Sequence, residues 1–122
     1  MTDRRPQGDT PRDRTTLFHL AARGEWVAAA SGDTYVPGAY AAESFIHCSY
    51  REQLDGVYER YYAGRSDDDL VLLEIDRARL EALVGAAAVV DESSTNGARF
   101  PHVYAPLPHG AVRAVRDLAW FR

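Results

Sequence analysis

The sequence predicts a single small α+β domain with a mixed, mostly antiparallel sheet and two to three helices. With 122 residues, the chain is long enough for one hydrophobic core and too short for two ordinary domains. Short apolar segments typical of strands are interspersed with helical segments. Most links between predicted strands lack a full crossover helix, and this favours a mixed or antiparallel sheet over a doubly wound one.

Residues 1–14 are predicted to be a disordered tail, followed by a single domain over 15–122. After Met1, this first segment has no apolar residue and contains two prolines. Such a segment buries too little surface to offset the entropy lost on ordering.

Short apolar runs bounded by turn residues predict the strands. The clearest is the continuous run LVLLEI, which follows three consecutive aspartates. The predicted strands are 17–20, 45–48, 70–75, 89–91, 100–104 and 112–120, with a brief extended piece at 35–36.

Apolar periodicity and capping residues predict the helices. Ser49 and Glu52 form an S-x-x-E capping box ahead of a stripe of leucine, valine and tyrosine side chains. Asp76 is suited to cap a later helix, which Gly85 closes. The predicted helices are 25–30, 50–62 and 77–84.

Charge and hydropathy limit the classes of partner that the chain is expected to bind. The net charge is −4, and every one of the 14 basic residues is an arginine. Because the acidic body has no basic stripe, we expect no binding to duplex nucleic acid. The longest apolar run, 84–90, is too short to span a bilayer, so no membrane partner is expected. The absence of a secretory signal and the single Cys48 are typical of a cytoplasmic protein.

The segment FIHCS is the most informative for function. In a strand, alternate side chains share a face, so His47 lies with Phe45 and Ser49 while Ile46 and Cys48 point the other way. Cys48 is therefore interpreted as a core residue. Two interpretations of His47 remain open, a donor that faces a ligand and a histidine satisfied within the sheet. The capping box gives Ser49 a structural role as well.

Two further histidines lie in predicted strands. His19 must find a polar partner or face a cavity, because burying an unpaired polar ring is costly. His102 and Tyr104 share one face of an extended segment. Together with His47, these histidines predict a shared pocket. Glu92, at a strand end, is suited to orient a hydroxyl or act as a base, although a solvent-facing acid is the alternative.

The three histidines also match a three-nitrogen zinc site with an open position. Their spacing is not one that metal sites usually show, so no residue is assigned as a metal ligand. A metal-dependent hydrolase therefore stays an alternative.

A set of landmarks occurs in order along residues 16–118: FHL (18–20), Trp26, FIHCS (45–49) followed by Gln53, LLEID (72–76), Glu92 and FPHVY (100–104). With these landmarks the chain resembles a small bacterial family known as domain of unknown function 952. Ser44 and Ala105 depart from the family pattern, which often has glycine there, and both changes are expected to narrow the approach of a ligand to the backbone.

The resemblance implies an ADP-ribosyltransferase-like fold, a group that also includes an RNA 2′-phosphotransferase. In that fold a first-strand histidine, here His19, meets an NAD ribose, and a histidine–x–serine strand matches His47 and Ser49. Glu92 takes the place of the late acidic residue. NAD is accordingly the implied cofactor.

The leading hypothesis is a pocket that binds NAD, ADP-ribose or a related nucleotide and performs ADP-ribosyl or phosphoryl transfer. A non-catalytic small-ligand sensor or accessory module is the second alternative, beside the metal-dependent hydrolase. The predicted catalytic residues are His47, Glu92 and His102, and the predicted ligand-binding residues are His19, Ser49 and Tyr104.

Overall fold

The computed structural model describes residues 13–122. Residues 1–12, which make up most of the predicted tail, lie outside the described residues. Arg14, placed in that tail by the prediction, contacts the domain. One of its guanidinium nitrogens lies 2.8 Å from a carboxylate oxygen of Glu52, and its guanidinium carbon lies 3.9 Å from the ring centroid of Tyr50.

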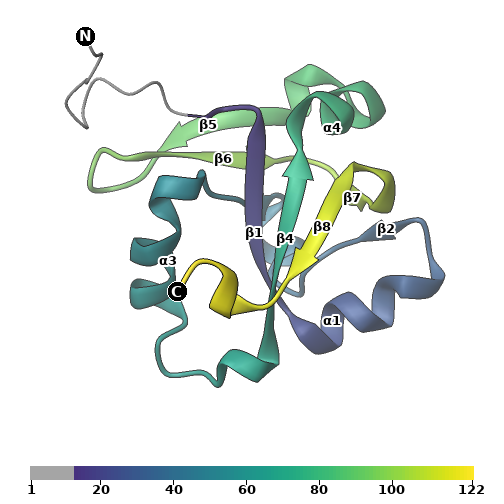
Figure 1. Cartoon of the computed structure of the whole chain (residues 1–122). Helices are drawn as coiled ribbons and strands as arrows, with labels where there is room; N and C mark the ends of the chain where they lie inside the picture. The colour runs from purple at the N-terminus through teal and green to yellow at the C-terminus, as the bar shows by residue number, and fades with distance from the viewer. Residues whose placement is uncertain (1–12) are drawn as a thin grey trace, which may run out of the picture.

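The largest sheet has the strand order β1-β4-β8 (Figure 1). It consists of β1 (Thr16–Ala22), β4 (Leu70–Asp76) and β8 (Val112–Arg116), and both strand pairs are antiparallel. The apolar run LVLLEI forms the central strand, as predicted. A predicted final strand over 112–120 is wrong at its end, because the chain turns into a 3₁₀ helix after Arg116.

The alternation of side chains along β1 divides the core in two. Leu17 and Ala21 belong to the larger apolar cluster, which also contains Leu80 from the helix after β4. Phe18 and Leu20 belong to the second cluster, on the opposite face of the strand. Both faces of β1 are therefore buried.

A second antiparallel sheet, of order β3-β6-β5, carries the residues of greatest functional interest. It is formed by β3 (Ile46–His47), β6 (Arg99–Val103) and β5 (Val89–Ser93). His47 pairs with His102 across β3 and β6. A single bridge between Phe18 and Ser49 links this sheet to β1.

The predicted single, partly mixed sheet is thus replaced by three small sheets in which every pair is antiparallel. The third is the two-residue pair of β2 (Thr34–Tyr35) and β7 (Leu107–Pro108). Short strands end their ladders early, and prolines such as Pro108 remove a donor from the ladder. Strand periodicity alone does not reveal where one sheet stops and the next begins.

Four α-helices lie within residues 13–122, against two to three predicted. The one that was missed is α2 (Tyr40–Glu43), a single turn too short to show helical periodicity. The others are α1 (Arg23–Ala28), α3 (Leu54–Tyr61) and α4 (Arg77–Val84). Short 3₁₀ turns occupy Ala29–Ser31, Arg51–Gln53, Asp67–Asp69, Ala86–Ala88, His109–Ala111 and Leu118–Trp120.

The capping predictions had different outcomes. Asp76 caps α4 through a 3.2 Å bond from the Arg79 backbone N–H, which confirms the prediction. The Ser49 capping box is wrong by one residue: the Tyr50 backbone N–H donates to Oε1 of Gln53 at 2.9 Å instead. Ser49 cannot take the capping position because its backbone pairs with Phe18 in the β-bridge.

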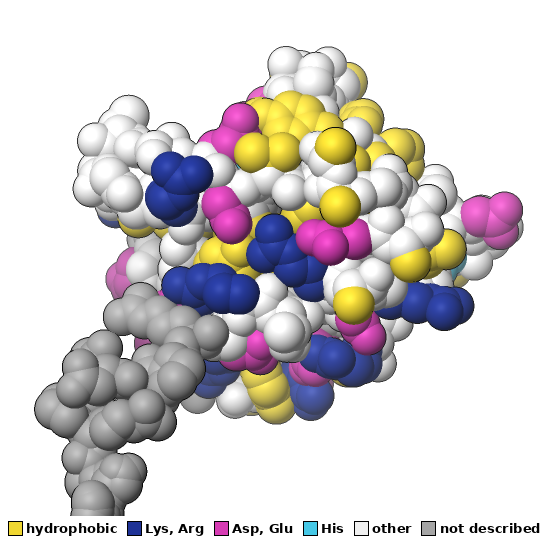
Figure 2. Space-filling view, turned by 90° about the horizontal axis from the view of Figure 1, so that it is seen from above, with side chains coloured by type: hydrophobic (Ala, Val, Ile, Leu, Met, Phe, Trp, Pro, Cys, Tyr) yellow, Lys and Arg dark blue, Asp and Glu magenta, His cyan; other side chains and the backbone are white. Residues whose placement is uncertain are grey.

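Figure 2 views the molecule from above relative to Figure 1. On this face, arginine and acidic side chains are interspersed, with no large basic area. This face therefore has no stripe of positive charge of the kind that tracks a phosphate backbone. Within residues 13–122, no helix has the length and apolar character needed to cross a bilayer.

Candidate functional site

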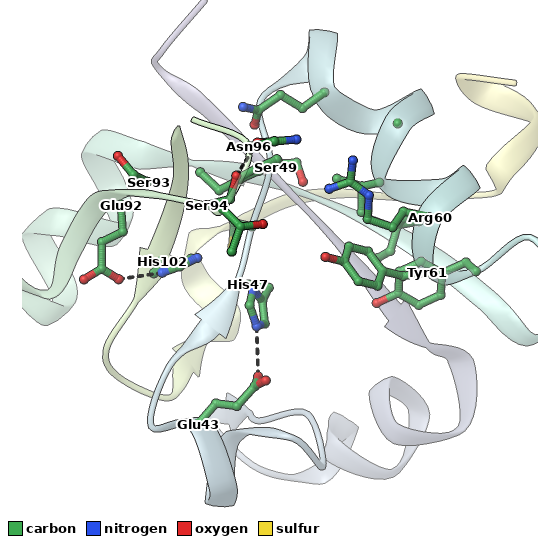
Figure 3. Close-up of a pocket in the computed structure, with 18 of the residues that line it drawn as sticks. Glu43, His47, Ser49, Arg60, Tyr61, Glu92, Ser93, Ser94, Asn96 and His102 are labelled. Atoms are coloured by element: carbon green, nitrogen blue, oxygen red, sulfur yellow. Dashed lines mark hydrogen bonds and ion pairs between the residues drawn. The ribbon is translucent and has the colours of Figure 1, made fainter. Parts of the chain in front are cut away.

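An open cleft of about 740 Å³ lies between α3 and the β5–β6 hairpin (Figure 3). β3 forms its floor with His47, and Ser49 follows on the same side of the chain. The hairpin contributes Glu92 and His102, and α3 contributes Arg60. The cleft therefore collects side chains from β3 and α3, which are close in the sequence, and from a hairpin that follows only after β4 and α4.

His102 and Glu92 form the first histidine–carboxylate pair of the cleft. His102 Nδ1 lies 2.5 Å from Oε1 of Glu92, and the Tyr104 hydroxyl donates to the same oxygen at 2.6 Å. These hydrogen bonds, from Tyr104 first and then from His102, lower the pKa of Glu92 below its usual range, so the carboxylate is ionised at neutral pH.

The bond to Glu92 determines which tautomer His102 adopts. A carboxylate accepts, so Nδ1 carries the proton and the neutral ring presents a lone pair at Nε2. Nε2 has no hydrogen-bond partner among the described residues, and in Figure 3 this nitrogen lies on the cleft side of the ring. His102 is thus arranged to accept a proton from a group bound in the cleft.

A second pair, His47 with Glu43, lies next to the first. His47 Nε2 lies 2.9 Å from Oε1 of Glu43, and the ring centroids of His47 and His102 are 5.0 Å apart. Phe45 stacks on His102 at 4.1 Å between centroids and meets the His47 ring edge-on at 4.7 Å. The aromatic contacts hold both imidazoles in place.

Glu43 did not emerge from the sequence. Its spacing of four residues to His47 is typical of a helical pair, but the two lie on either side of a turn from α2 to β3. The turn is made by Ser44, whose φ of 71° is left-handed. A glycine adopts this backbone without strain, which gives a physical reason for the glycine that the family resemblance implies at this position. Ser44 lines neither cavity, and the expected narrowing of a ligand approach there stays a prediction.

His19 lies behind the cleft. Its side chain is 6% exposed, Nδ1 donates to the His47 carbonyl oxygen at 2.7 Å, and Nε2 accepts from the Tyr35 hydroxyl at 2.9 Å. Burial lowers the pKa of His19 to about 4, so the ring is neutral near pH 7. His19 lines a smaller cavity of about 180 Å³ that shares His47 with the larger cleft.

The structure therefore brings four of the six predicted site residues into one cleft. Tyr104 does not line the cleft and supports Glu92 from behind. His19 braces the backbone of His47. The four in the cleft are His47, Ser49, Glu92 and His102.

Ser49 and Cys48 illustrate the alternation of this segment. The Ser49 hydroxyl lines the cleft, and no described residue forms a hydrogen bond with it. Cys48 is 2% exposed, and burial raises the pKa of its thiol to about 12. A thiol with this pKa is a poor nucleophile, and its predicted place in the core is confirmed.

Zinc and NAD are the two groups that the sequence implies for this cleft. Among residues 13–122, no three histidine, cysteine or acidic side chains are grouped as metal ligands. The lining offers hydroxyls and aromatic rings to a ribose and a base, but a single arginine, Arg60, toward phosphates. The residues thus match a ribose and an aromatic base better than the pyrophosphate of NAD.

The comparisons identify relatives of the whole domain. The first is an X-ray structure of the protein CC0527 from Caulobacter crescentus, with 31% identity, a TM-score of 0.73, and coverage of 84% of this chain and 85% of that chain. A solution NMR structure of CC0527 has 33% identity, a TM-score of 0.68, and coverage of 85% and 84%. No curated protein is significantly similar to this chain.

A family model described as "Protein of unknown function (DUF952)" matches residues 20–115. The matched structures are those of CC0527 and a double mutant of it, and no activity is named for them. The relationship to ADP-ribosyltransferases therefore stays a prediction. Because the family model matches most of the chain, this protein belongs to the DUF952 family.

Proposed function

We propose that the cleft binds a small nucleotide-like ligand and that the protein transfers a group to or from it, with His102 as general base. The observation that carries this proposal is the 2.5 Å contact between His102 Nδ1 and Glu92, which leaves Nε2 open to the cleft. A histidine oriented by a carboxylate and facing a cavity is a recurring arrangement in acid–base catalysis.

The transfer step follows from this geometry. As a hydroxyl oxygen of the ligand or of an acceptor attacks an electrophilic phosphorus or C1′ carbon, Nε2 of His102 takes the hydroxyl proton. The bond to the leaving group breaks, and the leaving group departs with the electron pair. The ionised Glu92 stabilises the imidazolium that forms.

His47 is assigned the complementary role. Its Nε2 is held by Glu43, and its Nδ1 has no partner among the described residues. In the protonated form, Nδ1 donates to a ligand oxygen or returns a proton to the leaving group. The buried His19 holds the His47 carbonyl and thereby fixes where this ring stands.

Thermal-shift titrations with adenosine, ADP-ribose and NAD test the binding step. A ligand at 100 times its dissociation constant stabilises the fold by about 2.7 kcal/mol, which is easily seen as a rise in melting temperature. We expect at least one of the three to stabilise the wild-type protein. No stabilisation by any of them or by a nucleoside monophosphate would overturn the proposal.

The ligand that binds is then incubated with the protein, and products are followed by mass spectrometry. We expect His102→Gln to lower the transfer rate by at least about 100-fold, the range for loss of a general base. Glu59→Gln, an exposed acid on α3 outside the cleft lining, is the control. Binding without turnover in the wild type would instead favour the sensor or accessory module.

A further inference from the structure

The charges that line the cleft are paired, with one exception. Each carboxylate of the lining has a partner of opposite or titratable charge. Arg60 has none within residues 13–122, and its guanidinium carbon lies 6.0 Å from the ring centroid of Tyr61. The three pairs are Glu43–His47, Glu52–Arg14 and Glu92–His102.

Arg60 lies in a cleft where a bound anion would also meet a hydroxyl donor. It extends from α3 into the cleft, whose lining it shares with Ser49 and His102 (Figure 3). Ser49 is 6% exposed, and its hydroxyl has no hydrogen-bond partner in the described part of the chain. A guanidinium and a free hydroxyl donor that line the same cleft are a combination suited to phosphate oxygens.

We propose that Arg60 and Ser49 form a subsite for a single phosphate group, so that the ligand of the cleft is a phosphate monoester. The attached hydroxyl-bearing part of the ligand then extends toward His102 Nε2. This inference rests on the proposed function and narrows its ligand to a monophosphorylated ribose or nucleoside.

The rest of the lining argues for one phosphate rather than several. Glu43, Glu52 and Glu92 line the same cleft, and a second phosphate would approach these carboxylates with no second arginine in the lining of this cleft to compensate. Arg65 lines only the smaller cavity. A pyrophosphate or a nucleic-acid backbone is therefore disfavoured. A phosphate monoester needs only one cation, and Arg60 is the cation of the lining that has no ion-pair partner within residues 13–122.

Inorganic phosphate and adenosine 5′-monophosphate are the probes, each titrated at constant ionic strength with thermal unfolding as the readout. Arg60→Gln removes the proposed contact. Arg51→Gln is its matched control, because Arg51 also lies beside an aromatic ring, 5.0 Å from that of Trp120, and lines neither cavity. Both probes are expected to stabilise the wild type and Arg51→Gln.

In Arg60→Gln, we expect both affinities to fall at least about tenfold, the usual effect of losing a charge-assisted hydrogen bond. Arg60→Lys keeps the charge but loses the two-pronged geometry, so an intermediate loss is expected. Arg60 is exposed, and its variants are expected to unfold at the wild-type temperature without ligand.

An equal response of wild type and Arg60→Gln to both probes would overturn the inference. So would a wild type that binds adenosine but shows no response to either phosphate probe, an outcome that leaves the proposed function standing. A wild type that responds to neither phosphate nor any nucleoside would overturn both.

Discussion

His19 and His102 are the same residue type on two strands of one small domain, yet their surroundings differ in one respect. Both ring nitrogens of His19 are bonded to protein groups, whereas within residues 13–122 only Nδ1 of His102 has such a partner. A buried polar group that is satisfied at both ends serves the fold, and a group with one nitrogen left open to a cavity is available for chemistry. Burial alone therefore does not distinguish a site residue.

The sheets that carry the two histidines differ in the same way. β1 and β4 pair over seven residues, and their side chains are buried on both faces. β3 and β6 pair over two residues, and the side chain of His47 is 57% exposed. The long ladder gives rigidity, and the short one leaves room for a cleft beside α3.

The largest expected difference is in stability. His19→Ala leaves the His47 carbonyl and the Tyr35 hydroxyl without their partner and opens a cavity, so we expect a loss of about 3 kcal/mol in unfolding free energy. His102→Ala removes the histidine partner of Glu92, but this carboxylate is accessible to solvent, so a loss of about 1 kcal/mol is expected. Urea unfolding of both variants measures the difference, and equal losses would contradict the comparison.

The pH dependence of stability is the next effect in size. The folded pKa of His19 is about 4, below the ordinary value of 6.5, so between these values the unfolded chain binds the proton more readily. The contribution of neutral His19 to the unfolding free energy is therefore complete above pH 6.5, and it is lost as the pH is lowered toward 4. From pH 7 to pH 5, we expect a loss of about 2 kcal/mol.

Urea unfolding at several pH values measures this loss, and NMR titration of the His19 ring protons assigns it. The lowered pKa of Glu92 acts below its ordinary value of 4.5, so the window from pH 7 to 5 lies above its effect. A stability that is flat across this window would contradict the role of a satisfied, neutral His19.

The smallest expected effect concerns the turn that joins α2 to β3. Ser44 has a φ of 71°, and relief of this strain by Ser44→Gly is expected to raise the unfolding free energy by about 0.5 kcal/mol after the entropy cost of glycine. Ser44→Val should lower it by about 1 kcal/mol. Denaturant midpoints measure both, and a destabilising Ser44→Gly would show that the Ser44 side chain has a role of its own.

Features that depend on neighbouring residues were predictable from the sequence. Alternation placed Ile46 and Cys48 in the core and His47 on the opposite face. The apolar run of β4 and the Asp76 cap of α4 also follow from local patterns. Side-chain alternation and helix capping act within a few residues, so the chain alone contains the information.

Features that depend on distant contacts were not predictable. The Ser49 cap failed because a bridge to Phe18, 31 positions earlier, takes its backbone. Glu43 was missed because its pairing with His47 depends on the single left-handed residue between α2 and β3. Arg60 has no ion-pair partner within residues 13–122, and this depends on where the cleft's distant carboxylates, such as those of Glu43 and Glu92, lie in the fold.

The sequence by itself determined an antiparallel α+β core, the DUF952 landmarks and the set of histidines to consider. Only the tertiary structure decided that His102 faces the cleft with a free nitrogen while His19 has none. The physical reason is that a ring nitrogen is free or occupied according to groups brought to it by other strands. Tyr35 and the His47 carbonyl contact His19 although they lie 16 and 28 positions away in the chain. A local sequence pattern contains no information about contacts at such separations.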